Sequence, residues 1–123
     1  MAKNLTAAEE KLAGIIWRDA PIASPDLVAA ARRELNWEKS TTYTILKKLC
    51  DKGVVKNENA AVSVLLTYDE LTALQSRRYI EESFGGSLPR FITSFIGGGK
   101  LSPDQVTELK KLIDEYDAGG DNG

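Results

Sequence analysis

A short basic segment, residues 37–53, most constrains how this chain can fold. Its sequence, WEKSTTYTILKKLCDKG, places apolar residues at helical intervals with hydroxyl and lysine side chains between them. Ser40 or Thr41 is suited to cap a helix at its start, and Gly53 is suited to the left-handed residue that ends one. The segment therefore predicts a helix over residues 40–52 that stops abruptly before an extended stretch.

Two further helices are predicted before this one. Thr6 and Glu9 form a T-x-x-E capping box, and apolar residues then repeat at helical spacing to about Asp19. A Ser-Pro-Asp sequence beginning at Ser24 supplies an N-cap, a first-turn proline and a carboxylate that the helix dipole favours. The second helix is therefore expected to run from this point to about Leu35.

The periodicity changes after the third helix. Residues 54–56 and 62–67 are rich in β-branched side chains, and residues 57–60 between them have the composition of a turn. Three helices followed by a hairpin is the order of a winged helix-turn-helix, in which the third helix enters the major groove of DNA and the hairpin lies against the backbone. The predicted fold is mostly α with a small β-hairpin, and residues 1–68 are predicted to form the DNA-binding domain.

A helical wheel divides the third helix into two faces. The side chains expected to pack inward are Thr42, Ile45, Leu46 and Leu49. The opposite face carries hydroxyls and lysines, which can meet phosphates and base edges. Five lysines lie within residues 37–56 against two acidic residues, so positive charge is concentrated there. The predicted DNA-binding residues are Lys39, Ser40, Thr41, Tyr43, Thr44, Lys47, Lys48 and Lys56.

Residues 69–116 are predicted to be a helical dimerisation domain in three pieces separated by runs of glycine. Helices this short cannot bury their apolar stripes alone, so we expect an intertwined homodimer with a shared core. The alternative is that the stripes fold back on the first domain of the same chain. The residues predicted at the dimer interface are Leu71, Leu74, Leu88, Phe91, Ile92, Phe95, Ile96, Leu109 and Ile113. Residues 117–123 are predicted to be a disordered tail.

Composition argues against most other functions. The 123 residues include no histidine and a single cysteine, Cys50, so the usual catalytic dyads, histidine-containing metal sites and disulfides lack their residues. We therefore expect no enzymatic activity, no metal site and no cofactor. No apolar run approaches a membrane span and no leader is evident, so we expect a cytoplasmic protein without membrane insertion. The net charge of −2 divides into +2 for residues 1–68 and −4 for residues 69–123.

Several motifs together are similar to one family. Residues 5–9, 44–49 and 84–87, with Trp37 and the Lys-Gly pair that ends at Gly53, resemble the penicillinase and methicillin-resistance repressors. The resemblance implies a homodimeric winged-helix repressor that binds an inverted repeat in double-stranded operator DNA, commonly with TACA/TGTA-like half-sites. Its targets would be antibiotic-resistance or stress genes.

The same resemblance implies a route of induction. In that family a signal from a membrane sensor leads a protease to cleave the dimerisation half, which releases the operator. The position here that matches the family's cleavage site is Ser94–Phe95. Related copper-responsive repressors end in a cysteine-rich metal site, and a chain with Cys50 alone lacks the ligands for it.

Two other functions stay open at this point. The wing lacks the Gly-Arg pair that this family usually carries there, and the pI is about 5.2. Both features are what a winged helix that binds proteins and does not recognise a DNA sequence would show. A small ligand at the dimer interface is the second alternative, although no residue identifies one. DNA binding and protein docking differ in salt dependence, because counterion release weakens DNA binding steeply as salt rises.

Overall fold

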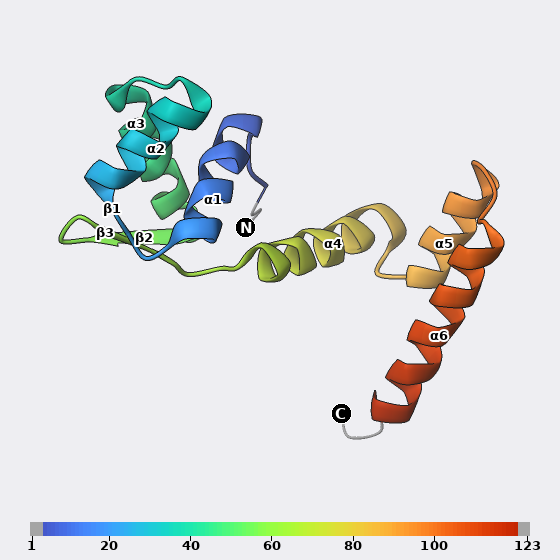
Figure 1. Cartoon of the computed structure of the whole chain (residues 1–123). Helices are drawn as coiled ribbons and strands as arrows, with labels where there is room; N and C mark the ends of the chain where they lie inside the picture. Colours follow the sequence, from blue (N-terminus) through green and yellow to red (C-terminus); the bar gives the residue numbers. More distant parts are fainter. Residues whose placement is uncertain (1–3, 121–123) are drawn as a thin grey trace. The chain divides into compact units, whose positions relative to one another are not determined.

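The computed structural model describes the backbone of residues 4–120 and the side chains of residues 4–117 (Figure 1). The elements in chain order are α1 (Ala7–Asp19), β1 (Ile22–Ala23), α2 (Ser24–Leu35), α3 (Lys39–Asp51), β2 (Val55–Glu58), β3 (Ala61–Val64), α4 (Tyr68–Phe84), α5 (Leu88–Gly97) and α6 (Pro103–Gly120). This order confirms the predicted winged helix-turn-helix fold, mostly α with a small sheet.

The chain divides into two compact units, residues up to Tyr79 and residues from Ile80 onward. The division falls within α4, whereas the predicted domain boundary at residues 68–69 lies where this helix begins. The assignment of residues 69–116 as a separate domain therefore stays a prediction. Helix α6 continues through Gly120, into the segment predicted to be a disordered tail, and residues 121–123 lie outside the described chain.

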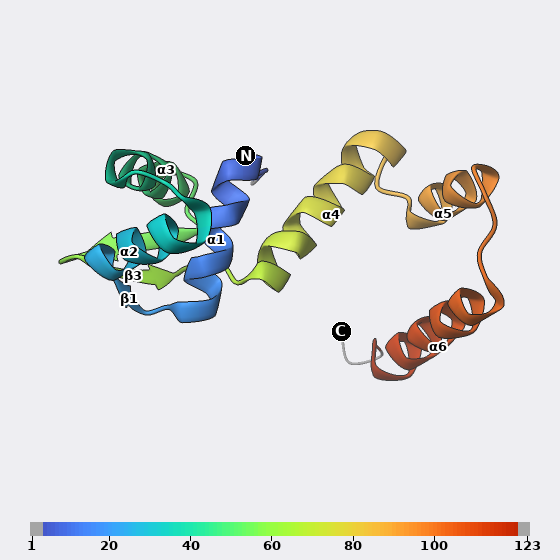
Figure 2. The ribbon, with the colours of Figure 1, turned by 45° about the horizontal axis from the view of Figure 1, so that its top comes forward.

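In the first unit, α1, α2 and α3 contact one another, and both α1 and α3 also contact the sheet (Figure 2). Their shared core contains the fully buried side chains of Leu12, Ile16, Leu27, Leu49, Val54 and Val62. Helix α3 contributes Thr42, Leu46 and Leu49 to the buried set, as the wheel predicts, and Ile45 is half-buried. The inner face of α3 is therefore part of the core.

The sheet is larger than the predicted hairpin. Strand β1 pairs with β3, giving an antiparallel sheet in the order β1-β3-β2. Sequence periodicity cannot detect β1 because it has two residues. The predicted turn at residues 57–60 is too long, since Asn57 and Glu58 pair with Val62 and Ala61.

Two of the predicted helix caps are wrong. Helix α2 has Ala23 at its N-cap position with no side-chain cap, and the backbone N–H of Ser24 donates to the carbonyl of Ala60 at 2.8 Å. The sheet thus holds the start of α2. Helix α3 begins at Lys39, so the predicted caps Ser40 and Thr41 lie inside its first turn, and its N-cap residue Glu38 makes no side-chain cap.

The other predicted helix signals are confirmed. The N–H of Glu9 donates to Thr6 Oγ1 at 3.2 Å, and the N–H of Thr6 donates to Glu9 Oε1 at 2.9 Å, which completes the capping box of α1. Gly53 has φ 78°, the left-handed conformation expected after α3. Trp17 packs edge-on against Tyr68 with ring centroids 5.4 Å apart, and its indole N–H donates to the carbonyl of Leu66 at 2.9 Å.

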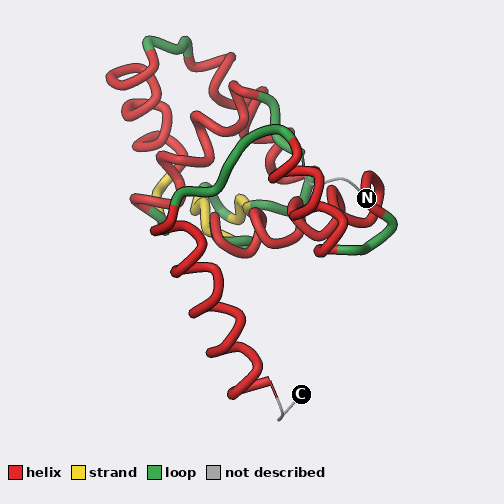
Figure 3. The backbone as a smooth tube through the Cα atoms, turned by 90° about the vertical axis from the view of Figure 1, so that its right-hand side faces the viewer, coloured by secondary structure: helices red, strands yellow, loops and turns green. Residues whose placement is uncertain are grey.

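The second unit consists of helices joined by short loops, which the backbone tube in Figure 3 marks in red and green. Ser87 caps α5, and a reciprocal pair of hydrogen bonds between Ser102 and Gln105, each 3.1 Å, caps α6. Phe91 lies between Phe84 and Phe95, with ring centroids 5.5 and 6.1 Å away. Within residues 4–120, no helix has both the length and the apolar character needed to cross a membrane.

The hairpin turn provides a test of the fold. Asn59 and Ala60 connect β2 to β3 with φ values of 53° and 60°, which are left-handed conformations. Asparagine tolerates this conformation, whereas alanine disfavours it. We expect Ala60→Gly to raise the free energy of unfolding by about 0.5–1 kcal/mol, because glycine removes that strain. Thermal denaturation followed by circular dichroism measures the effect.

Ala61→Gly is the matched control, since Ala61 is exposed and pairs within the sheet. Glycine there should lower stability. Destabilisation by Ala60→Gly would contradict the left-handed turn.

Candidate nucleic-acid interface

The predicted DNA-binding residues occupy two neighbouring elements. Seven lie on α3 and one, Lys56, lies on β2, and α3 contacts β2. Six of the seven on α3 are exposed, namely Lys39, Ser40, Thr41, Thr44, Lys47 and Lys48, and Lys56 is exposed as well. With its inner face in the core, α3 thus presents hydroxyls and ammonium groups to solvent. The roles of these residues in binding DNA stay predictions.

Tyr43 differs from the other residues in this set because it is half-buried. Its hydroxyl donates to Ser24 Oγ across 3.5 Å, and Lys39 Nζ lies 6.0 Å from the centre of its ring. The ring therefore joins α3 to the start of α2 and supports Lys39 through a weak cation–π contact. Part of its surface serves packing, and the rest remains accessible.

A partly buried ion pair holds the carboxyl end of α3. Lys52 Nζ lies 2.6 Å from Glu9 Oε1 and donates to the carbonyl of Asn4 at 2.9 Å. Glu9 is 2% exposed and accepts the N–H of Thr6 with the same oxygen. A single carboxylate thus closes the capping box of α1 and holds the last turn of α3 against it.

Burial alone would raise the pKa of Glu9. The hydrogen bonds from Lys52 and Thr6, together with the charges of Lys52 and Lys48, outweigh burial and lower its pKa. Sequence analysis identified Glu9 as a cap but missed its partner, because no local pattern signals a contact between residues so far apart in the chain.

The turn between α2 and α3 sets the direction in which α3 leaves α2. Asn36 adopts a left-handed conformation, with φ 58° and ψ 39°, and its N–H donates to the α2 carbonyls of Ala31 and Arg32. Arg32 also forms an ion pair of 2.9 Å with Glu38, the residue before α3. Asparagine tolerates this conformation better than most residues.

Two of the predicted DNA-binding lysines are paired with carboxylates. Lys47 Nζ lies 3.2 Å from Asp51 on α3, and Lys56 Nζ lies 3.2 Å from Glu58 on β2. All four side chains are at least half exposed. These ion pairs reduce the positive potential of the surface that α3 and β2 present.

The single cysteine shows no sign of reactivity. Cys50 is half-buried, and burial together with the charge of Asp51 raises the pKa of its thiol. The thiolate is therefore disfavoured. Among residues 4–117, no group of three or more histidine, cysteine or acidic side chains is arranged to hold a metal ion.

Most residues predicted at the dimer interface are accessible in the single chain. Leu74, Leu88, Phe95, Ile96 and Ile113 are between 45% and 58% exposed. Phe91, Ile92 and Leu109 are half-buried. Leu71 is 3% exposed, so its side chain is already packed within the first unit and offers no surface to a second copy.

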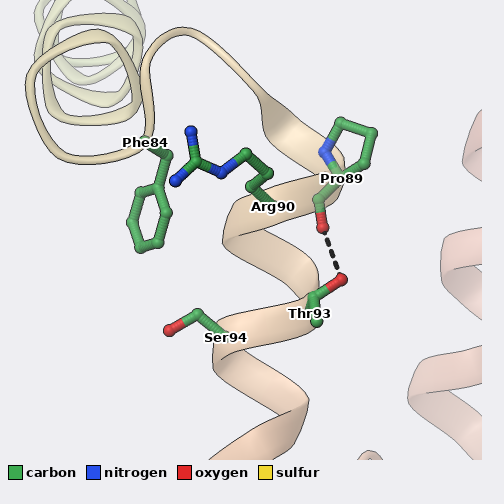
Figure 4. Close-up of a pocket in the computed structure, with 5 residues that line it drawn as sticks. All are labelled: Phe84, Pro89, Arg90, Thr93 and Ser94. Atoms are coloured by element: carbon green, nitrogen blue, oxygen red, sulfur yellow. Dashed lines mark hydrogen bonds between the residues drawn. The ribbon is translucent and has the colours of Figure 1, made fainter.

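The end of α4 and the first turns of α5 border an open hollow of about 400 Å³ (Figure 4). It is lined by Phe84, Pro89, Arg90, Thr93 and Ser94. The guanidinium of Arg90 extends towards Phe84, and Thr93 Oγ1 donates to the carbonyl of Pro89 at 2.9 Å. Ser94 and Phe95, the predicted cleavage position, are both exposed on α5.

Three packed helices, an antiparallel sheet and a third helix with an exposed polar face define a winged helix-turn-helix protein. Comparison with protein families identifies the family within this class. Residues 5–115 match the family model described as penicillinase repressor, and the chain belongs to that family.

Individual relatives are distant in sequence but similar in extent. The chain is 19% identical over 117 residues to the penicillinase repressor of Bacillus licheniformis, which covers 92% of this chain and 91% of that protein. It is 20% identical over 116 residues to the methicillin resistance regulatory protein MecI of Staphylococcus epidermidis, covering 91% and 94%. An uncharacterised 16.5 kDa protein of Latilactobacillus sakei is 24% identical over 120 residues, covering 92% and 82%.

The ion pair between Glu9 and Lys52 generates a stability prediction. We expect Glu9→Gln to lower the free energy of unfolding at pH 7 by about 2 kcal/mol, because Lys52 loses its charged acceptor. The folded-state pKa of Glu9 lies below its ordinary value of 4.5, so its stabilisation is complete above pH 4.5 and is lost as pH falls through the folded-state pKa.

Urea denaturation of the wild type and of Glu9→Gln at pH 7 and at pH 3 measures this effect. The difference in the free energy of unfolding between the two proteins should be smaller at pH 3. Glu10→Gln removes the neighbouring exposed carboxylate and serves as the control. An equal loss of stability in Glu9→Gln and Glu10→Gln would show that Glu9 stabilises the fold only as a negative charge near the start of α1, and not through Lys52.

Proposed function

We propose that this protein is a homodimeric transcriptional repressor that occupies an inverted-repeat operator, with α3 of each protomer in one half-site. The observation that carries the proposal is the two-sided character of α3. Its inner face is held in the core, and its outer face presents Ser40, Thr44 and Lys47 to solvent. Hydroxyls and ammonium groups on a rigidly mounted helix are suited to phosphates and base edges in the major groove.

Membership of the penicillinase repressor family supports the same proposal. Relatives that match nearly the whole chain are named as a penicillinase repressor and a methicillin resistance regulator. We therefore propose that the target genes concern antibiotic resistance or a related stress response. The absence of arginine from α3 means that shape and phosphate contacts contribute much of the affinity.

Exposed apolar side chains support the dimer. Leu88, Phe95 and Ile96 on α5 and Leu112, Ile113 and Tyr116 on α6 are all at least 45% exposed. A second copy of the chain would cover these stripes with the same apolar surface, as two-fold interfaces do. Joining two half-sites in one binding event would then raise operator affinity well above that of a single protomer.

We also propose that proteolysis relieves repression. Ser94 and Phe95 are exposed on α5, and Phe95 is itself one of the apolar residues assigned to the interface. Cleavage there would separate α6 from the DNA-binding unit and remove much of the dimer surface. A protease linked to a membrane sensor would supply the signal, by analogy with the family.

The test of this function is a footprint on the DNA upstream of the protein's own coding region and of its neighbours. Purified full-length protein is titrated at two salt concentrations. A repressor that neutralises about 6 to 10 phosphates should protect a dyad and lose affinity steeply as salt rises. A lack of protection at low salt would instead favour a protein-interaction module, the function that a wing without arginine suggests.

Substitutions in α3 locate the binding surface. We expect Thr44→Ala and Lys47→Ala each to weaken operator binding by about 1–3 kcal/mol, because each side chain faces the proposed groove. Fluorescence anisotropy with the protected DNA measures this loss. Dimer mass and helicity should be unchanged, and Lys110→Ala on α6 is the control. Operator binding as tight as that of the wild type in both α3 variants would show that this face of α3 does not contact the operator.

A charge placed on the apolar stripe of α5 tests the dimer. We expect Phe95→Glu to convert the protein to monomers, since a carboxylate cannot be buried unpaired in an apolar interface. Sedimentation equilibrium measures the mass. Thr93→Glu adds the same charge to the opposite face of α5 and should leave the dimer intact. A dimer that persists in the Phe95 variant would refute this interface.

A further inference from the structure

We propose that Asp51 and Glu58 compete with DNA phosphates for Lys47 and Lys56, and so reduce binding to DNA of the wrong sequence. This inference rests on the proposed function and concerns its specificity. The same arrangement occurs on both elements assigned to DNA: an exposed lysine is paired with a carboxylate of the same element. Lys47 Nζ lies 3.2 and 3.5 Å from the two oxygens of Asp51, and Lys56 Nζ lies 3.2 Å from Glu58.

The pairs are open to displacement by phosphate. The side chains of Lys47 and Asp51 are 77% and 65% exposed, and those of Lys56 and Glu58 are 50% and 70% exposed. Ion pairs this exposed contribute little to folding and are screened by salt. Lys39 and Lys48 form no salt bridge of this kind among the described residues, and the charge of Lys48 also acts on the carboxylate of Glu9.

Helix stability does not account for Asp51. It is the last residue of α3, where the negative end of the helix dipole disfavours a carboxylate. A lysine followed by an acidic residue four positions later is also the less favourable order for a pair on a helix. Glu58 lies beside the exposed hairpin turn, on the same face of β2 as Lys56, and its side chain is 70% exposed.

The two kinds of DNA complex respond differently to these carboxylates. Binding to an arbitrary sequence depends on contacts between lysines and phosphates, so the negative charges of Asp51 and Glu58 act directly against it. At the operator, base contacts by α3 fix the helix in the groove, and Asp51 lies at the end expected to leave the groove. The repulsion between Asp51 and DNA is therefore smaller at the operator than at other sites.

The experiment compares the wild type with Asp51→Asn and with Glu58→Gln, as full-length proteins, on the operator and on a scrambled duplex of the same length. We expect each variant to bind the scrambled duplex about 3- to 10-fold more tightly and the operator less than about 3-fold more tightly. The slope of log K against log salt on the scrambled duplex should steepen by about 1 for each lysine released. Circular dichroism and titration of the operator at stoichiometric concentrations confirm that the variants are folded and fully competent to bind DNA.

Asp114→Asn is the control for net charge. Asp114 is exposed on α6, on the face opposite the apolar stripe, and removing it changes the charge equally. Asp114→Asn should leave the affinities for the operator and for the scrambled duplex unchanged. An equal gain in this control would assign the effect to net charge alone and overturn the inference.

Failure of the inference and failure of the proposed function give different results. Variants that match the wild type on both duplexes, while the wild type binds its operator, overturn only the role of Asp51 and Glu58. A wild-type protein that binds neither duplex overturns the proposed function and this inference with it.

Discussion

The position of α3 depends on the ion pair between Glu9 and Lys52. The Glu9 carboxylate is 2% exposed and closes the cap of α1, while Lys52 Nζ, 2.6 Å away, anchors the end of α3. At the other end, Asn36 and the ring of Tyr43 join α3 to α2. A helix held at both ends presents its outer side chains in a fixed arrangement, which recognition of base edges requires. The rest of the first unit serves to hold that arrangement.

Polar side chains and exposed apolar side chains are concentrated on different elements. Residues 7–64 enclose one apolar core, and α3 and β2 expose hydroxyls, lysines and ion pairs. The second unit leaves aromatic and aliphatic side chains accessible on α5 and α6. In the proposed dimer these stripes supply the association energy, and the paired lysines of the first unit moderate the attraction to DNA. Affinity and specificity would then be set by different parts of one short chain.

Local signals in the sequence predicted the helices well. The capping box at Thr6, the glycine after α3 and the inward face of α3 all depend on neighbours a few residues apart, and the structure confirms each. Contacts between distant residues could not be predicted in this way. Strand β1 exists because Ile22 pairs with Val62, and its two residues carry no periodicity. For the same reason the sequence did not identify Lys52 as the partner of Glu9 or Leu71 as a residue buried in the first unit.

The central claim is that the outer face of α3 lies in the major groove of each half-site. A DNA-cleaving reagent tethered to cysteine tests it directly, with Cys50 replaced by Ala and a cysteine introduced at Thr44, which is exposed on that face. The labelled protein is used at concentrations that saturate the operator, because replacing Thr44 is itself expected to weaken binding. We expect cuts in the major groove at two positions related by the dyad of the footprint, and none from the same reagent attached at position 114. Cuts outside the protected dyad, or equal cutting from both positions, would contradict it.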